Sequence, residues 1–320
     1  MRYKQKIKIN YSDFWLGFNK DNNFFNDLLS KNYDIELSDN PDFLIYSCYS
    51  KDYLAYDCIR ILYLAENQRP DFSGCDFAFT FDYNNDPRHF RLPLYALYGD
   101  VNKLIKNISR DEAKEILKSK TGFCNMVVSN ARRCKRIEFF KKLSSYKKID
   151  SGGRYLNNIG EPVKNKIEFV KDYKFTFAFE NSSYPGYTTE KVFEPMLVNS
   201  IPIYWGNPLV GKDFNTKSFI NYHDYNNDKK VMDRIIEVDQ NDDLYLEMLM
   251  QPWYNDNRPN SSVINQNILN KLDYIISQKD KIKPVAQSKK KYLHFVKSKK
   301  TYLIDKAKIK IDYLLNQYEI

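Results

Sequence analysis

Short apolar runs alternate with amphipathic segments over the first 120 residues of the chain. Runs of β-branched and aromatic residues, bounded by turn-forming residues, predict buried strands. These runs fall at residues 6–10, 42–47, 60–64 and 76–81. Helical spacing predicts helices at 24–30 and 109–120, and Ser109 with Glu112 predicts a capping box at the start of the second helix.

The same alternation resumes at residue 123. Strands are predicted at 124–129, 175–179, 201–205 and 219–223, and helices at 130–145, 165–173, 229–236 and 242–250. Parallel strands need long crossover connections, usually helices, so this order predicts an α/β fold of two doubly wound domains that face a cleft. We expect an N-terminal domain over residues 1–120, a second domain over 121–280 and a separate C-terminal segment over 281–320.

The stretch from residue 175 to residue 205 predicts a strand, a polar loop, a short helix and a second strand. Thr188 and Thr189 precede Glu190, which favours a helix N-terminus at this point. Ligands of parallel sheets bind at the carboxyl ends of strands, where loops lead into helix N-termini. The free backbone N–H groups of such a terminus, with Lys191 beside them, predict an anionic ligand, most simply a diphosphate.

The C-terminal segment carries most of the charge. Residues 279–320 hold twelve lysines and four acidic residues, which give +8 of the net charge of +9. The nearly neutral remainder argues against a nucleic-acid-binding body. From residue 289 onward apolar residues recur at helical spacing, with lysines opposite, which predicts a basic amphipathic helix. Its apolar face either packs on the body or docks the chain on an anionic membrane surface.

The five scattered cysteines form no Cys-x-x-Cys pattern, which favours free thiols in a reducing compartment. No apolar run approaches the roughly 20 residues of a membrane-spanning helix, and no signal peptide is evident at the N-terminus. We therefore expect a cytoplasmic protein, soluble or peripheral on the inner face of the membrane.

Several short sequence motifs resemble those of a known family. The segment 179–206 contains F-E-N-S, then G-Y-x-T-E-K, then I-P-I-Y-W-G, which is similar to the donor-binding signature of the α1,3/α1,4-fucosyltransferases. Shorter segments similar to members of this family lie at residues 64–67, 90–95, 127–130, 151–153, 163–166 and 212–215. The resemblance covers about residues 60–255. It implies a fold of the GT-B type and an inverting, metal-independent transfer of fucose from GDP-fucose. The chain contains no Asp-x-Asp, the pattern that holds a metal on a donor diphosphate in other transferases, so we expect no metal and no cofactor.

The resemblance also implies roles for single residues. Arg136 and Lys191 would bind the donor diphosphate as permanent cations, although both residue types are also common on solvated surfaces. Glu66, at the end of an apolar strand, would be the general base, or else a cap of the next loop. Glu190 would contact the fucose hydroxyls and stabilise positive charge, as a second catalytic carboxylate.

Two more residues would line the donor pocket, namely Asn181 and Tyr187. Glu180 would either join them or tie the loop together.

The acceptor implied is an oligosaccharide of the Gal-GlcNAc type, with attack by O3 of GlcNAc, in the synthesis of a surface glycan such as lipopolysaccharide. Two alternatives remain open from the sequence. One is a transferase of the same fold with another nucleotide sugar or linkage, which a panel of donors would reveal. The other is a glycan-binding protein with an inactive site. The argument against it is the presence of Glu66, Arg136, Glu190 and Lys191.

Overall fold

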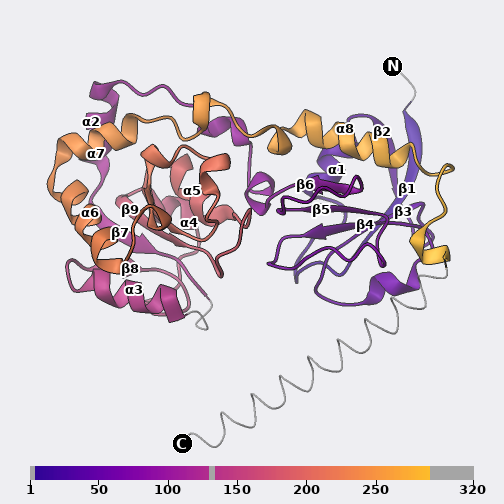
Figure 1. Ribbon diagram of the computed structural model, residues 1–320, viewed down its shortest axis with the longest axis horizontal. Helices are drawn as coiled ribbons and strands as arrows, with labels where there is room; N and C mark the ends of the chain where they lie inside the picture. The colour runs from indigo at the N-terminus through magenta and orange to yellow at the C-terminus, as the bar shows by residue number, and fades with distance from the viewer. Residues whose placement is uncertain (1–3, 130–133, 289–320) are drawn as a thin grey trace, which may run out of the picture. The chain divides into compact units, whose positions relative to one another are not determined.

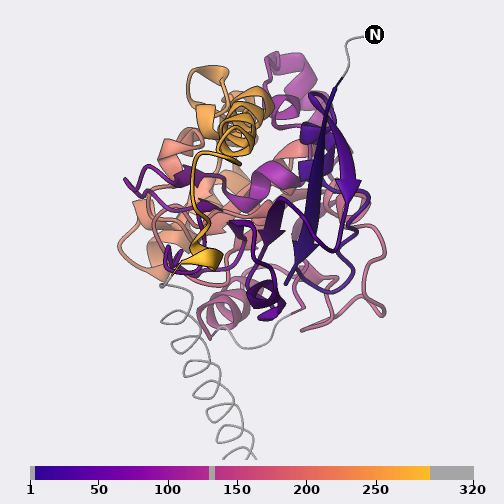
Figure 2. The same cartoon turned by 90° about the vertical axis from the view of Figure 1, so that its right-hand side faces the viewer.

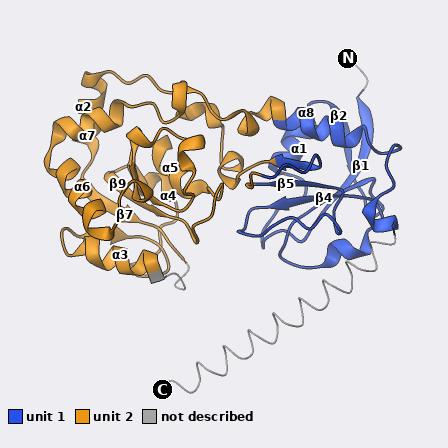
Figure 3. Ribbon diagram, in the orientation of Figure 1, with its two compact units in different colours: residues 1–80, 84–90, 268–320 blue, residues 81–83, 91–267 orange. Residues whose placement is uncertain are grey.

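The computed structural model describes residues 4–129 and 134–288. Within these residues the strands form one six-stranded and one five-stranded sheet, and the chain divides into two compact units (Figures 1 and 3). Unit 1 takes its described residues from 1–80, 84–90 and 268–320, and unit 2 from 81–83 and 91–267. Two parallel sheets with helical connections confirm the predicted α/β class.

Unit 1 contains the six-stranded sheet, in the order β2-β1-β3-β4-β5-β6. Its elements are β1 (Gln5–Ser12), α1 (Phe24–Leu29), β2 (Tyr33–Leu37), β3 (Phe43–Tyr46), β4 (Ile59–Leu64), β5 (Phe77–Thr80), β6 (His89–Arg91) and α8 (Asn265–Ile276). The pairs from β2 to β5 are all parallel. The carboxyl ends of β1, β3 and β4 therefore lie at one edge of the sheet, as the pairing of Ser12 with Tyr46 shows.

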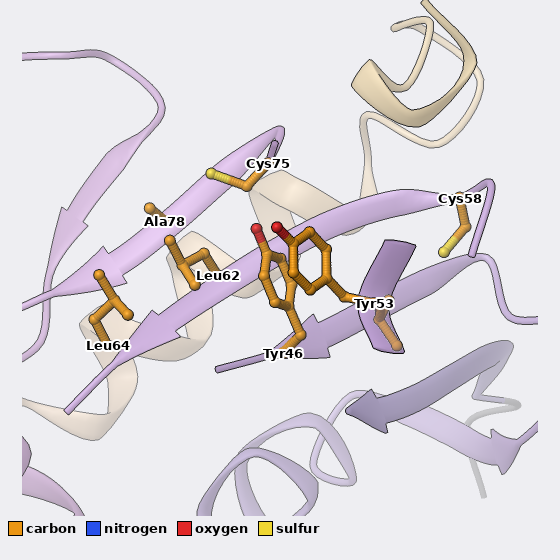
Figure 4. Packing of buried hydrophobic residues seen from close by; sticks show 8 residues of the cluster. Tyr46, Tyr53, Cys58, Leu62, Leu64, Cys75 and Ala78 are labelled. Atoms are coloured by element: carbon orange, nitrogen blue, oxygen red, sulfur yellow. The ribbon is translucent and has the colours of Figure 1, made fainter. Parts of the chain in front are cut away.

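Burial on both faces explains why β3, β4 and β5 read as continuous apolar runs. On one face the stacked rings of Tyr46 and Tyr53, 4.2 Å apart between centroids, pack among Leu62, Cys75 and Ala78 (Figure 4). Helix α8 covers part of the unit (Figures 1 and 2), with Tyr274 edge-on to Phe77 of β5.

Unit 2 contains the five-stranded sheet, in the order β11-β10-β9-β7-β8. All its printed pairs are parallel. Its strands are β7 (Gly122–Met126), β8 (Ile149–Ser151), β9 (Tyr173–Phe179), β10 (Ile201–Trp205) and β11 (Ile220–Asn221). Its helices are α2 (Arg110–Ser119), α3 (Cys134–Ser144), α4 (Lys166–Val170), α5 (Glu190–Leu197), α6 (Asp228–Gln240) and α7 (Asp242–Met250). The central strand β9 therefore places its carboxyl end beside those of β7 and β10.

Local signals placed several helix ends correctly. The capping box of Ser109 and Glu112 is present at the start of α2. Thr189 is the N-cap of α5, as predicted. Pro195 lies inside α5, and the helix ends at Leu197, two residues later.

Other elements differ from the sequence-based expectation. Strand β2 and helix α8 were not expected, and the helix expected at 165–173 is shorter because β9 already begins at Tyr173. The unit boundaries also differ from the expected domains: residues 91–120 group with unit 2, and the helix near residue 270 returns to unit 1. The amphipathic helix expected from residue 289 onward lies outside the described residues.

Candidate active site

The carboxyl end of β9 and the N-terminus of α5 meet at a buried carboxylate, Glu180. The backbone N–H and the hydroxyl of Thr189 each donate a hydrogen bond of 2.7 Å to the two Glu180 oxygens. Glu180 is fully buried, and desolvation raises the pKa of its carboxyl group despite the nearby Lys191 ammonium. Glu180 thus ties the loop after β9 to the start of α5, which is one of the two roles left open by the sequence.

Lys191 lies between two carboxylates. Its Nζ is 3.0 Å from Glu190 Oε1 and 3.5 Å from Glu180 Oε2, and it donates to the Thr189 hydroxyl at 3.2 Å. Burial alone would lower the pKa of Lys191, but Glu190 and Glu180 outweigh that effect and raise it. Desolvation likewise opposes ionisation of Glu190, whereas Lys191 and Lys166 lower its pKa to about 2. Glu190 and Lys191, both in the first turn of α5, are therefore held in their charged forms near neutral pH.

Arg136 approaches the same strand end from helix α3. One terminal nitrogen of its guanidinium donates to the Phe179 carbonyl oxygen at 2.8 Å and to Asn181 Oδ1 at 2.9 Å. The Arg136 side chain is buried, which is unusual for an arginine on a basic helix. Arg136 and Lys191 are thus brought together around residues 179–181, where the sequence placed the anionic ligand.

Tyr187, another predicted donor-binding residue, is buried like Arg136. Only 2% of its surface is exposed, and its ring packs edge-on to Phe81 with centroids 5.1 Å apart. Asn207 holds the chain on both sides of Tyr187: its side chain accepts from the Gly186 N–H at 2.7 Å and donates to the Thr188 hydroxyl at 3.0 Å. Asn207 was missed in the sequence, where its position after the W-G pair was the only signal.

Gly206 is required by the close approach of Glu180. A Cβ at position 206 would lie 2.3 Å from Glu180 Cγ, well inside van der Waals contact. The glycine of the W-G pair therefore makes room for the buried carboxylate. This contact links the end of β10 to the end of β9 within the same unit.

Glu66 lies in unit 1, directly after β4 at the carboxyl edge of the six-stranded sheet. It is partly buried, and the Tyr49 hydroxyl donates to its Oε1 at 3.0 Å. The predicted base is therefore at a strand end, as the sequence indicated, and on a different unit from Arg136, Asn181, Glu190 and Lys191. Tyr49 was not singled out from the sequence, because nothing in its spacing marks it.

No group of three or more His, Cys, Asp or Glu side chains suited to a metal ion occurs in residues 4–129 and 134–288. Among the described helices, none combines the length and the apolar character needed to cross a membrane.

Two family models match this chain. The model of the α-(1,3)-fucosyltransferase FucT N-terminal domain matches residues 9–98, and that of the C-terminal part of glycosyltransferase family 10 (fucosyltransferase) matches residues 117–270. The chain belongs to the glycosyltransferase family 10 fucosyltransferases.

Known proteins agree with this assignment. The chain is 32% identical over 263 residues to the α-(1,3)-fucosyltransferase FucT of Helicobacter pylori, which covers 70% of this chain and 55% of that protein. The chain thus spans about half the length of this relative. A crystal structure of an α1,3-fucosyltransferase with GDP-fucose matches with a TM-score of 0.75 and 28% identity, over 89% of this chain and 94% of that one. A crystal structure of an α1,3-fucosyltransferase with GDP matches with a TM-score of 0.73 and 27% identity, over 90% and 94% of the two chains.

Proposed function

We propose that this protein transfers L-fucose from GDP-fucose to a hydroxyl of an oligosaccharide acceptor, O3 of GlcNAc in a Gal-GlcNAc unit. The observation that carries the proposal is the meeting of Arg136 and Lys191 at the carboxyl end of β9, against the N-terminus of α5. Family membership and the likeness to a structure with bound GDP-fucose support the choice of donor.

In this mechanism the donor diphosphate is held by cations and backbone dipoles. Lys191 stays protonated because Glu190 and Glu180 raise its pKa, so it presents a full charge to the phosphates at every physiological pH. The N-terminus of α5 adds a partial positive charge. These groups stabilise the negative charge that develops on GDP as the bond between fucose C1 and the phosphate oxygen breaks.

The acceptor hydroxyl attacks C1 of fucose from the face opposite GDP, which inverts the configuration. Glu66 takes the proton of that hydroxyl as the new glycosidic bond forms, and GDP leaves with the electron pair of the broken bond. Glu190, ionised because its pKa is lowered to about 2, orients the fucose hydroxyls and stabilises the positive charge that develops on the sugar ring. Asn181, held by Arg136, shares in orienting the donor.

We further propose that no divalent metal is needed. Lys191, Arg136 and the helix N-terminus would neutralise the diphosphate, which is the task a metal performs in other transferases. The test is transfer to N-acetyllactosamine from GDP-fucose in EDTA, with GDP release and the product linkage as readouts. Unchanged rates in EDTA support the proposal, and a loss that Mg²⁺ or Mn²⁺ restores contradicts it.

The residue roles are tested in the same assay. Glu66→Gln should lower the transfer rate 10²- to 10⁴-fold, the usual contribution of a general base, and leave GDP binding unchanged. A wild-type rate in Glu66→Gln would refute the assigned base. No transfer by the wild type from GDP-fucose, with activity from another donor in a panel of nucleotide sugars, would refute the donor.

The cellular context is also a proposal: synthesis of a surface glycan such as lipopolysaccharide, on the cytoplasmic side, with residues 285–320 on an anionic membrane. The sequence suggests a test by deletion of residues 285–320, and the contacts of residues 285–288 favour a cut a few residues later. The Val285 N–H donates to Asp76 at 2.8 Å and Gln287 donates to the Asp57 carbonyl oxygen, so these residues belong to unit 1. A chain ending at Ser288 should lose binding to anionic vesicles and keep turnover of soluble acceptors, whereas an insoluble product would favour packing of the tail on the body.

A further inference from the structure

Three loops meet at the carboxyl edge of the six-stranded sheet in unit 1. They follow β1, β3 and β4, which are neighbours in the sheet, and they carry Trp15, Tyr49 and Glu66. The Tyr49 hydroxyl donates to Glu66 at 3.0 Å, and the ring of Tyr49 lies edge-on to Trp15 with centroids 6.4 Å apart. A continuous row of two aromatic rings and a carboxylate therefore lies along this edge.

The loop after β1 presents apolar side chains to solvent. The Phe18 N–H donates to the Trp15 carbonyl oxygen at 3.1 Å and closes a turn. Gly17, the third residue of this turn, has φ of +87°, which suits a glycine in a type II turn. Leu16 at the tip is fully exposed and Tyr49 is 47% exposed. Exposed apolar groups clustered beside a polar one are typical of binding surfaces.

The base of this loop is rigid. The rings of Phe14 and Phe18 stack with centroids 3.9 Å apart. Phe18 also packs on Tyr11 of β1, and Phe14 packs on Tyr63 of β4, with centroids 5.4 and 6.4 Å apart. Packing of this kind fixes the position of Trp15 before any ligand arrives, which lowers the entropic cost of binding.

The Tyr49 loop is fixed to the end of β1 by one residue, Asp13. The Asp13 backbone oxygen accepts from the Tyr49 N–H at 3.0 Å. Its carboxylate accepts from the N–H groups of Asp52 and Tyr53, both at 2.9 Å. Hydrogen bonds to a carboxylate are stronger than those between neutral groups, so the spacing between Trp15 and Tyr49 is set by the fold.

We propose that Trp15 and Tyr49 form an aromatic platform on which the apolar face of the acceptor sugar stacks, with Glu66 at its rim. The inference rests on the proposed function, since it assigns the subsite where the attacked hydroxyl meets its base. The C–H groups of a pyranose form an apolar face, and its hydroxyls are hydrogen-bond donors to a carboxylate. Rigid aromatic rings next to a few polar groups are the usual composition of a small-molecule site. Tyr49 acts as a positioning residue, because its hydroxyl fixes the orientation of the Glu66 carboxylate.

The test uses the full-length protein and N-acetyllactosamine. Saturation-transfer difference NMR should show transfer from the protein to the sugar ring protons in the wild type, and at least a fivefold smaller signal in Trp15→Ala. Trp15→Phe keeps a ring and should restore most of the signal. In the transfer assay Trp15→Ala should raise the KM for the acceptor at least tenfold, with the KM for GDP-fucose within twofold of wild type.

Tyr49→Phe separates the platform from its hydrogen bond. It keeps the ring, so the acceptor KM should stay within threefold of wild type, while kcat should fall because the Glu66 carboxylate has lost the hydrogen bond that fixes its orientation. A Tyr49→Phe variant with the kcat of the wild type would remove the positioning role.

Calorimetric measurement of GDP binding distinguishes a failure of this inference from a failure of the proposed function. If the wild type binds no GDP, the proposed donor is wrong. If GDP binds equally to wild type and Trp15→Ala, the platform is tested by saturation transfer to N-acetyllactosamine. An equal signal in the two proteins, or no signal in the wild type, overturns the platform. A dimer of the wild type that Trp15→Ala abolishes would assign the exposed loop to a second copy of the chain and also overturn it.

Discussion

Replacing Lys191 with methionine removes the cation that lies between two carboxylates. In the variant Glu180 and Glu190 would face each other without a positive charge, and the buried Glu180 would take up a proton on folding. The destabilisation at pH 7 cannot exceed the free energy needed to protonate Glu180, because a glutamate has an ordinary pKa of 4.5. That limit is about 3.4 kcal/mol at about 1.4 kcal/mol per pH unit. At pH 5 the same limit falls to about 0.7 kcal/mol.

We therefore expect Lys191→Met to be less stable than wild type by about 3 kcal/mol at pH 7 and by about 1 kcal/mol or less at pH 5. The sign follows from the raised pKa: the folded variant keeps a proton that the unfolded chain releases above pH 4.5 or so, and stability falls as the pH rises from there. Urea unfolding at the two pH values measures the difference. Lys229→Met, in an exposed pair with Asp233, is the matched control and should change stability by less than about 0.5 kcal/mol at either pH.

Two results would contradict this account. The first is a destabilisation of Lys191→Met that is the same at pH 5 and pH 7, since the reasoning makes it a proton-linked effect. The second is a loss below about 1 kcal/mol at pH 7, which would mean that the carboxylates are solvated rather than held against the cation.

Three further predictions concern the same unit. Gly206→Ala should destabilise the protein by about 1–3 kcal/mol and weaken GDP binding, because its methyl group would displace Glu180; unchanged calorimetric binding and melting temperature would contradict this. Asp213→Ala should cost about 3–5 kcal/mol in urea unfolding, because it leaves the largely buried Arg91 guanidinium without the carboxylate that it contacts at 2.6 Å. Glu190 has a pKa lowered to about 2, so its stabilising effect is complete above the unfolded value of 4.5 and is lost as the pH falls toward 2. The stability difference between wild type and Glu190→Gln should therefore shrink over that range, and a difference that is constant with pH would speak against the ion pair.

The sequence alone determined the fold class and the strand end at which the candidate site lies. Buried strands of parallel sheets read as apolar runs whatever surrounds them, so β3, β4, β9 and β10 were found directly. The N-cap of α5 and the capping box of α2 were equally local signals, because they depend on residues within one turn. Long contiguous motifs then identified the family without any knowledge of tertiary contacts.

The tertiary structure decided what the individual side chains do. The approach of β9, β10 and α5 buries Glu180 and brings it within hydrogen-bond distance of Thr189. It also places Lys191 between Glu180 and Glu190. No short window of sequence specifies this approach. The hydrogen bond from Tyr49 to Glu66 could not be predicted for the same reason, since Glu66 is seventeen residues away and on a different loop. Helix α8 returns to unit 1 after more than 170 residues, and such long-range pairing is set by the packing of apolar faces rather than by local pattern.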